Sequence, residues 1–133
     1  MSHINFLTQR VSFPRLTTPA PTHEQLTKMF EAACRAPDHK QLRPWRFLVV
    51  TGQARKTLGE VMAKADGLTV DDENWTKSSE RLLRAPLIII VITVFKEHEK
   101  VPRVEQVLST GAAANNILLA ADALGFGGIW RTG

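Results

Sequence analysis

The sequence predicts one domain of mixed helices and strands, either an α/β or an α+β layer. With 133 residues, of which 44% are hydrophobic and 23% charged, the chain holds enough apolar material for one core and is too short for two. Two apolar, β-branched runs alternate with segments of helical periodicity, an order that argues against a helix bundle or a β-sandwich. No internal repeat or low-complexity tract interrupts this order.

The first predicted helix covers residues 22–35. Thr22 and Gln25 have the spacing of a capping box, in which each side chain binds a free backbone amide of the other residue. Apolar residues then recur at helical spacing as far as Ala33, and Pro37 stops the pattern.

Two further helices follow the same reasoning. Apolar residues over positions 58–65 mark one helix, which Gly67 closes. A longer helix, rich in small residues, runs over positions 107–121, and Gly125 is placed to be its left-handed cap. Small side chains along this helix predict that another helix approaches it closely.

Two strands are expected from apolar, β-branched runs. Residues 46–51 form the first, ended by Gly52, and residues 87–95 form the second. The second run is too apolar for a solvated face, so it is expected to be a central strand. Residues 126–131 read as the start of a further strand.

Charge and cysteine content limit the class of protein. The net charge of +4 fits a phosphorylated small molecule as easily as a nucleic acid. Cys34 is the single cysteine, which rules out an intrachain disulfide and suits a reducing cytoplasm. A lone cysteine in a helix is most often a small core residue. No signal-peptide core is visible, and the longest apolar run is about half of the roughly 18 residues of a membrane span.

Motifs of side-chain catalysis are absent from the sequence. It contains no phosphate-binding P-loop, no dinucleotide fingerprint, no zinc-protease helix and no nucleophile elbow. If the protein is an enzyme, we therefore expect something other than a side chain to react. The glycine-dense stretch 125–131 is either a helix cap followed by a tight strand entry, which is favoured, or bare backbone for a flat ring or a phosphate.

Basic residues gather in three places: residues 10–15, residues 35–46 and Arg131. Arg10 and Ser12 pair a guanidinium with a hydroxyl, which suits a phosphate, although each cluster alone is more often a solvated surface. The remaining cations of the middle cluster are interpreted as surface charges or as groups that attract nucleotide phosphates: Lys40, Arg43 and Arg46.

Four motifs occur in order along nearly the whole chain. They are RxSxxRLxxPAPTxEQL at residues 10–26, RAPDHKxxxPWxF at 35–47, HEKVPRxEQ at 98–106 and GFGGIWRxG at 125–133. Together they closely resemble the flavin-dependent nitroreductase family, and specifically its compact bacterial NAD(P)H nitroreductase subgroup.

The resemblance implies an α+β fold in which helices flank a central, mostly antiparallel sheet. It also implies an intertwined homodimer that binds one FMN noncovalently at each of two sites along the interface. The family uses FMN to carry two electrons in a ping-pong reaction from NAD(P)H to a nitroaromatic or quinone-like acceptor. The flavin performs the chemistry, so no side chain is expected to be catalytic, and no metal, nucleic acid or membrane partner is expected.

The resemblance also assigns site residues. Those expected to contact FMN are Arg10, Val11, Ser12, Arg35, His39, Trp130, Arg131 and Thr132. Those expected at the nicotinamide nucleotide are Ala120, Ala121, Asp122, Ala123, Leu124 and Gly125. Val11 stands where the subgroup often has a second arginine. Arg35 and Arg131 are candidates for the flavin edge that becomes negative on reduction.

The family continues beyond position 133, so residues 1–133 are expected to be a single nitroreductase-like domain without its C-terminal extension. Such a chain should bind FMN poorly and associate through the helix that carries Ala112, Ala113 and Leu118. Two other functions stay open. One is a flavin-binding relative with weak catalysis, and the other, ranked last, is a basic nucleic-acid-binding domain.

Overall fold

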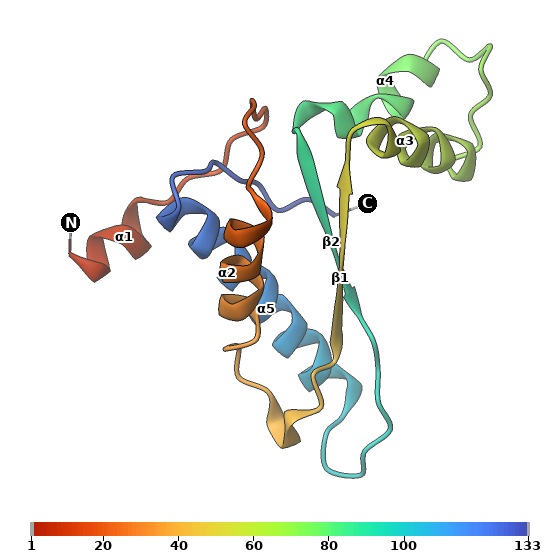
Figure 1. Ribbon diagram of the computed structural model, residues 1–133. Helices are drawn as coiled ribbons and strands as arrows, with labels where there is room; N and C mark the ends of the chain where they lie inside the picture. The colour runs from red at the N-terminus through yellow and green to blue at the C-terminus, as the bar shows by residue number, and fades with distance from the viewer. Residues whose placement is uncertain (1, 133) are drawn as a thin grey trace. The chain divides into compact units, whose positions relative to one another are not determined.

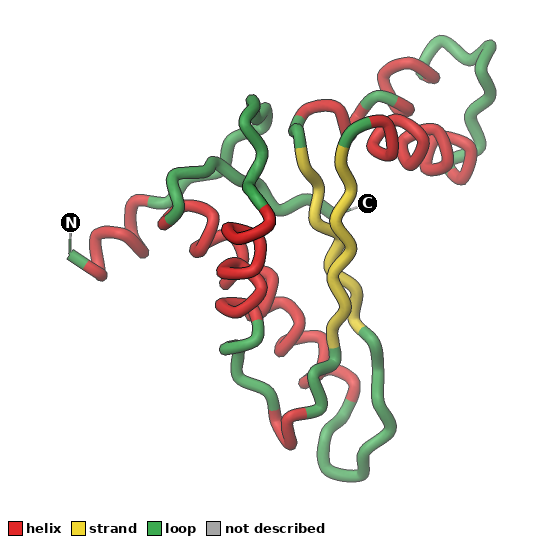
Figure 2. The backbone as a smooth tube through the Cα atoms, in the orientation of Figure 1, coloured by secondary structure: helices red, strands yellow, loops and turns green. Residues whose placement is uncertain are grey.

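The computed structural model describes residues 2–132 of the chain. Figures 1 and 2 show helices and strands in an α+β arrangement, as the sequence predicts. The elements in chain order are α1 (His3–Gln9), α2 (His23–Ala33), the 3-10 turn η1 (His39–Gln41), β1 (Trp45–Thr51), α3 (Gln53–Ala65), α4 (Trp75–Ser79), the 3-10 turn η2 (Arg81–Arg84), β2 (Leu87–Thr93) and α5 (Arg103–Ala123).

These elements belong to two compact units. The first unit combines residues 2–14, 21–47 and 91–132, and it contains α1, α2, η1 and α5. The second unit combines residues 15–20 and 48–90, and it contains α3, α4 and η2. Strands β1 and β2 pair with each other, and within the first unit the amide of Val94 donates to the carbonyl of Pro44 at 2.9 Å.

Helix α2 begins with the predicted capping box. The hydroxyl of Thr22 accepts from the amide of Gln25 at 3.3 Å, and the side-chain oxygen of Gln25 accepts from the amide of Thr22 at 2.9 Å. The helix ends at Ala33, two residues earlier than predicted, because Cys34 is the C-cap and Arg35 lies in the following turn. The two capping-box contacts of Thr22 and Gln25 satisfy backbone amides that a helix start leaves free.

The core of the first unit is the packing of α2 against α5, which lie side by side in Figure 1. Ala33 of α2 and Ala113 of α5 are completely buried, and Met29 and Ile117 are buried beside them. The side-chain amide of Asn116 donates to the carbonyl of Ala32 at 2.9 Å. The predicted close approach of a second helix to the small residues of α5 is therefore confirmed, since short side chains leave the backbones near each other.

Gly125 ends α5 in the left-handed conformation, as predicted, with φ of 87°. The amide of Phe126 donates to the carbonyl of Ala121 at 2.9 Å, and the amide of Gly125 donates to that of Asp122 at 3.0 Å. This is a Schellman cap, which satisfies carbonyls that the helix end would leave free.

The second unit depends on a close helix crossing. A Cβ atom on Gly59 of α3 would lie 1.9 Å from the carbonyl oxygen of Ser79, so only glycine fits there. The guanidinium of Arg55 donates to the carbonyl of Ala85, and Arg81 pairs with Asp66 at 3.2 Å. None of the predicted site residues lies in this unit.

Three expectations about the fold are wrong or only partly met. Residues 126–131 form no strand in the described chain, because a strand needs a hydrogen-bonded neighbour that a local pattern cannot supply. Cys34 is exposed rather than buried, since one residue after Ala33 the chain has turned by about 100° from the face that meets α5. Residues 87–93 form β2, but each of them is partly exposed, because the sheet in the described chain has two strands.

Candidate functional site

The loop after α2 carries Arg35, His39 and further cations in a constrained conformation. Lys40, Gln41 and Arg43 have φ of 63°, 51° and 48°, a left-handed region that costs a non-glycine residue about 1–3 kcal/mol. The carboxylate of Asp38 offsets part of this cost by accepting from the amides of Leu42 at 3.2 Å and Arg43 at 2.8 Å. The loop therefore has a defined shape fixed by one acidic side chain.

Helix α5 anchors this loop along one of its faces. His39 Nδ1 lies 3.0 Å from Glu105 Oε2, the hydroxyl of Ser109 donates to the carbonyl of Pro37, and Asn116 binds Ala32 as described above. At about 100° per residue, Glu105, Ser109 and Asn116 lie within about 40° of one another around the helix axis. The segment that carries Arg35 and His39 therefore follows a single face of α5.

The glycine-rich segment after α5 packs on a different face of the same helix. A Cβ atom built on Gly128 would lie 3.0 Å from Cδ2 of Leu118, and one built on Gly111 would lie 3.6 Å from Cη2 of Trp130. Gly111 and Leu118 point roughly 150° away from the face that anchors His39. The segment that ends at Trp130 and Thr132 therefore lies on the nearly opposite side of α5.

Residues 10–13 join the second of these faces. The amide of Phe13 donates to the carbonyl of Gly128 at 3.2 Å. The eight residues predicted to contact FMN thus fall into two sets within one chain. We call them the α5-front set, which is Arg35 and His39, and the α5-back set, which is Arg10, Val11, Ser12, Trp130, Arg131 and Thr132.

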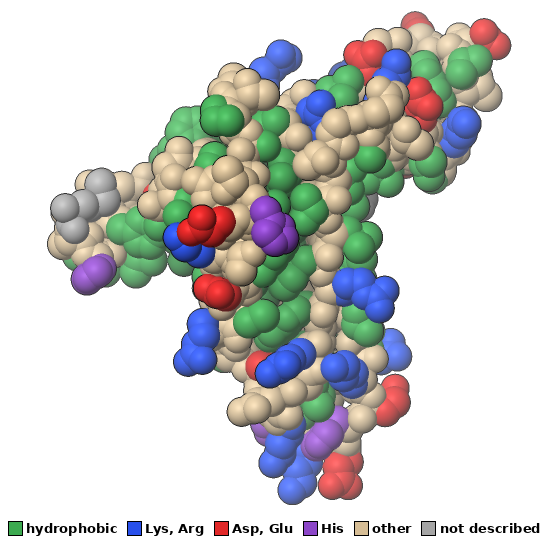
Figure 3. Space-filling model, in the orientation of Figure 1, with side chains coloured by type: hydrophobic (Ala, Val, Ile, Leu, Met, Phe, Trp, Pro, Cys, Tyr) green, Lys and Arg blue, Asp and Glu red, His purple; other side chains and the backbone are tan. Residues whose placement is uncertain are grey.

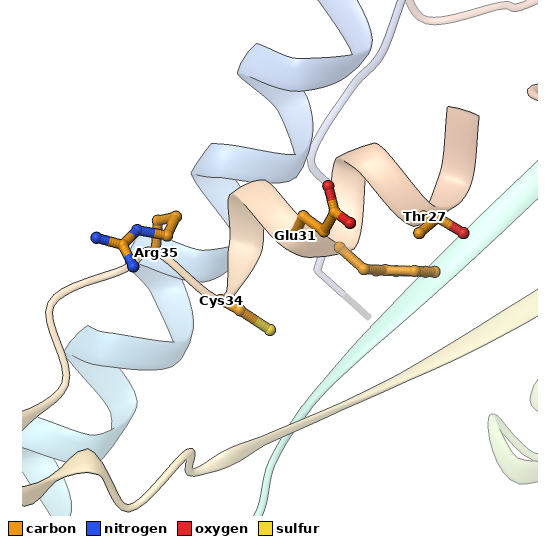
Figure 4. Close-up of a pocket in the computed structure, with 5 residues that line it drawn as sticks. Thr27, Glu31, Cys34 and Arg35 are labelled. Carbon is orange, nitrogen blue, oxygen red and sulfur yellow. The ribbon is translucent and has the colours of Figure 1, made fainter. Parts of the chain in front are cut away.

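A surface hollow lies beside the α5-front set. Its volume is about 470 Å³, and it is lined by Thr27, Phe30, Glu31, Cys34 and Arg35. Figure 4 shows these side chains along α2, with Cys34 and Arg35 at its C-terminal end. The ring of Phe30 stacks on that of Phe47, with centroids 5.2 Å apart and planes 12° apart. Arg35 therefore lies at one end of a hollow whose wall includes Phe30, one ring of this stacked pair.

The donor groups of both sets fit FMN in chemical type. Among residues 2–132, the guanidinium groups of Arg10, Arg35 and Arg131 have no carboxylate partner. That of Arg10 donates to the carbonyl of Val11 at 3.1 Å. The hydroxyl of Ser12 is on an exposed residue, and Trp130 is 51% exposed. Unpaired guanidinium groups and a hydroxyl suit a phosphate, and an exposed indole suits a flat ring.

The segment expected at the nicotinamide nucleotide lies at the C-terminal end of α5. Ala121 is buried, and Asp122 lies in the last turn, which has no basic residue. The negative end of the helix dipole lies there as well. This end of α5 therefore offers little to attract a phosphate.

Two residues that support the site were missed from the sequence. Glu105, the partner of His39, and Gln106, which is buried and 2% exposed, both lie in the motif at residues 98–106. The motif identifies this stretch but not the partners of the two side chains. Glu105 contacts His39, which is distant in sequence, and Gln106 binds an irregular loop. Within the described chain, no three His, Cys, Asp or Glu side chains form a group that could hold a metal ion, and no helix has the length and apolar character needed to cross a membrane.

Comparisons with known proteins agree with this architecture. The pattern of the nitroreductase family matches residues 7–133. The whole chain is 44% identical to "Putative NAD(P)H nitroreductase YdjA" of Escherichia coli K12 and 40% identical to "Putative NAD(P)H nitroreductase" of Haemophilus influenzae, and it spans 73% of each.

Solved structures show the same fold. A nitroreductase-like family protein from Bacillus cereus superposes with a TM-score of 0.82 at 28% identity, over 100% of this chain and 71% of that one. An FMN-dependent nitroreductase from Clostridium difficile R20291 superposes with a TM-score of 0.66 at 31% identity, over 93% of this chain and 62% of that one. The chain belongs to the nitroreductase family, in its compact NAD(P)H nitroreductase subgroup, and is an oxidoreductase.

Proposed function

We propose that this protein is an FMN-dependent oxidoreductase that uses NAD(P)H to reduce nitroaromatic or quinone-like acceptors in a ping-pong reaction. Family membership supports the class of reaction. The name of the Clostridium difficile neighbour, an FMN-dependent nitroreductase, supports the choice of flavin. The donor chemistry of the α5-front and α5-back sets supports a phosphate and a flat ring as parts of the ligand.

The observation that carries the proposal is the position of the two sets on nearly opposite faces of α5. A single ligand could touch both sets of one chain only by reaching around the helix, whose diameter with side chains is about 10–12 Å. Two chains avoid this difficulty, because one can present its front set and the other its back set to the same ligand. We therefore propose a homodimer with two equivalent flavin sites.

Each predicted residue then has a role within such a site. In the back set, Arg10 and Ser12 bind the phosphate, Val11 lies between them, and Trp130, Arg131 and Thr132 line the ring. Arg35 and His39 of the front set approach from the second chain. Glu105 is a positioning residue, because its contact with His39 orients the imidazole. When bound, FMN supplies the two-electron carrier between NAD(P)H and the acceptor.

The proposal places the protein in the cytoplasm, where an exposed cysteine such as Cys34 stays reduced. It assigns no chemical step to a side chain. The protein's contribution is to hold the flavin, to exclude competing contacts and to set the charge around the ring. Residues 120–125 are proposed to line the nicotinamide nucleotide, as the family resemblance implies.

The test is spectroscopic. Protein supplied with excess FMN should be yellow, with the absorption of bound FMN, and anaerobic NADH or NADPH should bleach it until a nitroaromatic or quinone is added. Yellow protein that neither nucleotide bleaches would instead support a flavin-binding relative with weak catalysis. Colourless protein that is retained on DNA would contradict the proposal and favour the nucleic-acid-binding alternative.

A further inference from the structure

The loop over residues 37–44 is anchored to α5 at both of its ends. The hydroxyl of Ser109 donates to the carbonyl of Pro37, and the hydroxyl of Thr110 donates to that of Pro44 at 2.9 Å. Ser109 is 8% exposed and Thr110 is 5% exposed, so both contacts are shielded from water. Two neighbouring residues of one helix therefore fix the points at which the loop begins and ends.

The loop between β2 and α5 supports the middle of this first loop. The side-chain amide of Gln106 makes three hydrogen bonds to the backbone of residues 96–101, at 2.8, 2.9 and 3.1 Å. The ammonium group of Lys96 then donates to the carbonyl of Leu42. Figure 3 shows histidine, lysine and arginine side chains on the surface at the bottom of the view, where Figure 1 places both loops. The backbone of residues 37–44 is thus supported from two elements of the first unit.

The carboxylate of Asp38 closes the same loop from within. Asp38 is the N-cap residue of η1, a position from which a side chain usually binds the amides two or three residues ahead, yet it makes no such contact. It accepts instead from the amides of Leu42 and Arg43, beyond the turn. Among residues 2–132 it forms no ion pair. The carboxylate therefore serves the backbone of the loop rather than the cations on it.

His39 lies inside the segment that Asp38 closes. Its imidazole lies 3.0 Å from the carboxylate of Glu105, and the two side chains are 50% and 46% exposed. Glu105 and Ser109 are four residues apart in α5, so they lie on one face of the helix. This face thus holds both the imidazole of His39 and, through Pro37, the backbone that precedes it. Asp38 fixes the backbone that follows.

We propose that Asp38 is a positioning residue of the flavin site, which keeps the imidazole of His39 on Glu105 before FMN binds. The inference rests on the proposed function, and it gives Asp38 no contact with FMN, only an effect through His39. Left-handed backbone at the three non-glycine residues of this loop is unfavourable, so without the carboxylate the loop relaxes to other conformations. FMN then binds only the fraction of chains that still holds His39 in place.

Fluorescence titration of the apoprotein with FMN tests this role. The Kd of Asp38→Ala should rise about tenfold, as expected if about one tenth of the chains keep the loop conformation. Asp38→Asn retains one carbonyl oxygen as an acceptor, so it should cause a smaller rise. Glu99→Ala, which removes an exposed carboxylate from the neighbouring loop, is the matched control and should change Kd by less than about twofold.

Combination with His39→Ala separates positioning from a general loss of stability. In the His39→Ala background, Asp38→Ala should raise Kd by less than about twofold, because the residue through which Asp38 acts is gone. An unchanged Kd in Asp38→Ala alone, or the same rise in both backgrounds, overturns the inference. If Asp38→Ala does not fold, the same cycle with Asp38→Asn decides the question.

The imidazole of His39 reports the same contact in the apoprotein, without flavin. Its NMR resonances, assigned by their loss in His39→Ala, should shift in Asp38→Ala toward their positions in Glu105→Ala, whereas those of His23 should stay unchanged. His39 resonances that do not shift overturn the inference. If they shift as expected but the wild-type protein binds no FMN, the proposed function fails while the link from Asp38 to His39 stands.

Discussion

His39 Nδ1 lies 3.0 Å from Glu105 Oε2, in the first turn of α5. Gly111 lies six residues further along the same helix and faces the ring of Trp130. A Cβ atom built on Gly111 would lie 3.6 Å from Cη2 of that ring. The two contacts point away from each other around the helix axis. Helix α5 is thus the element that sorts the predicted flavin residues into two sets, and it gives the proposed site its dependence on a second chain.

Replacement of Arg10 tests the phosphate contact. Arg10→Ala should weaken FMN binding by about 1.5–3 kcal/mol, the value of a charge-assisted hydrogen bond. The FMN affinity of Arg10→Lys should lie between those of Arg10→Ala and the wild type, because lysine keeps the charge and loses the forked geometry. Fluorescence titration of apoprotein with FMN measures both affinities, with Lys56→Ala as the control. Equal, small losses in Arg10→Ala and Lys56→Ala would contradict the assignment.

The glycine inside α5 and the glycine that caps it should respond to alanine with opposite changes in the free energy of unfolding. At Gly111, in the interior of α5, a Cβ atom would make an ordinary contact with Trp130 at 3.6 Å, so alanine should raise the free energy of unfolding by about 0.5–1 kcal/mol through helix propensity. At Gly125, with φ of 87°, alanine should lower it by about 1 kcal/mol. Urea denaturation at one fixed protein concentration measures both. If alanine changed the free energy of unfolding in the same direction at both positions, either the role of Gly125 as a cap or that of Gly111 as an interior helix residue would be wrong.

Gln106 should matter for stability far more than its polar character suggests. Gln106→Met keeps the length of the side chain and removes three hydrogen bonds to residues 96–101. At about 0.5–1.5 kcal/mol for each bond, the free energy of unfolding should fall by about 1.5–4.5 kcal/mol. Gln53→Met, at an exposed position at the start of α3, should have almost no effect in the same denaturation experiment. Comparable losses for the two variants would remove the argument that Gln106 fixes the loop.

Local signals in the sequence predicted much of the fold. The Thr22 and Gln25 pair located the start of α2, and Gly125 located the end of α5, because each device acts within a few residues of itself. Helix α1 was missed, although the side chain of Ser2 caps it by accepting from the amide of Asn5 at 3.2 Å. Helix α4 has five residues, too few to show a period.

The arrangement of the site needed the structure. Resemblance named Arg35, His39 and Trp130 together, but which of them share a face of α5 depends on contacts between residues far apart in sequence, such as Asn116 with Ala32. The expected strand over residues 126–131 failed for the same reason, because pairing with another strand is not a local property. Which cations of residues 35–46 are neutralised was likewise undecided until the partners of Asp38 and His39 were known.

A mixed dimer tests whether each flavin site consists of the α5-front set of one chain and the α5-back set of the other. Chains that carry Arg10→Ala and Arg35→Ala can be given different affinity tags, coexpressed and purified through both tags in turn. In a shared site, both substitutions fall in one site of the mixed dimer and leave the other intact. The predicted result is one FMN per mixed dimer bound with wild-type affinity, whereas each homodimeric variant binds FMN more weakly than the wild type at both sites. Weak binding at both sites of the mixed dimer would contradict the shared site, because it would show that each chain supplies Arg10 and Arg35 to the same flavin.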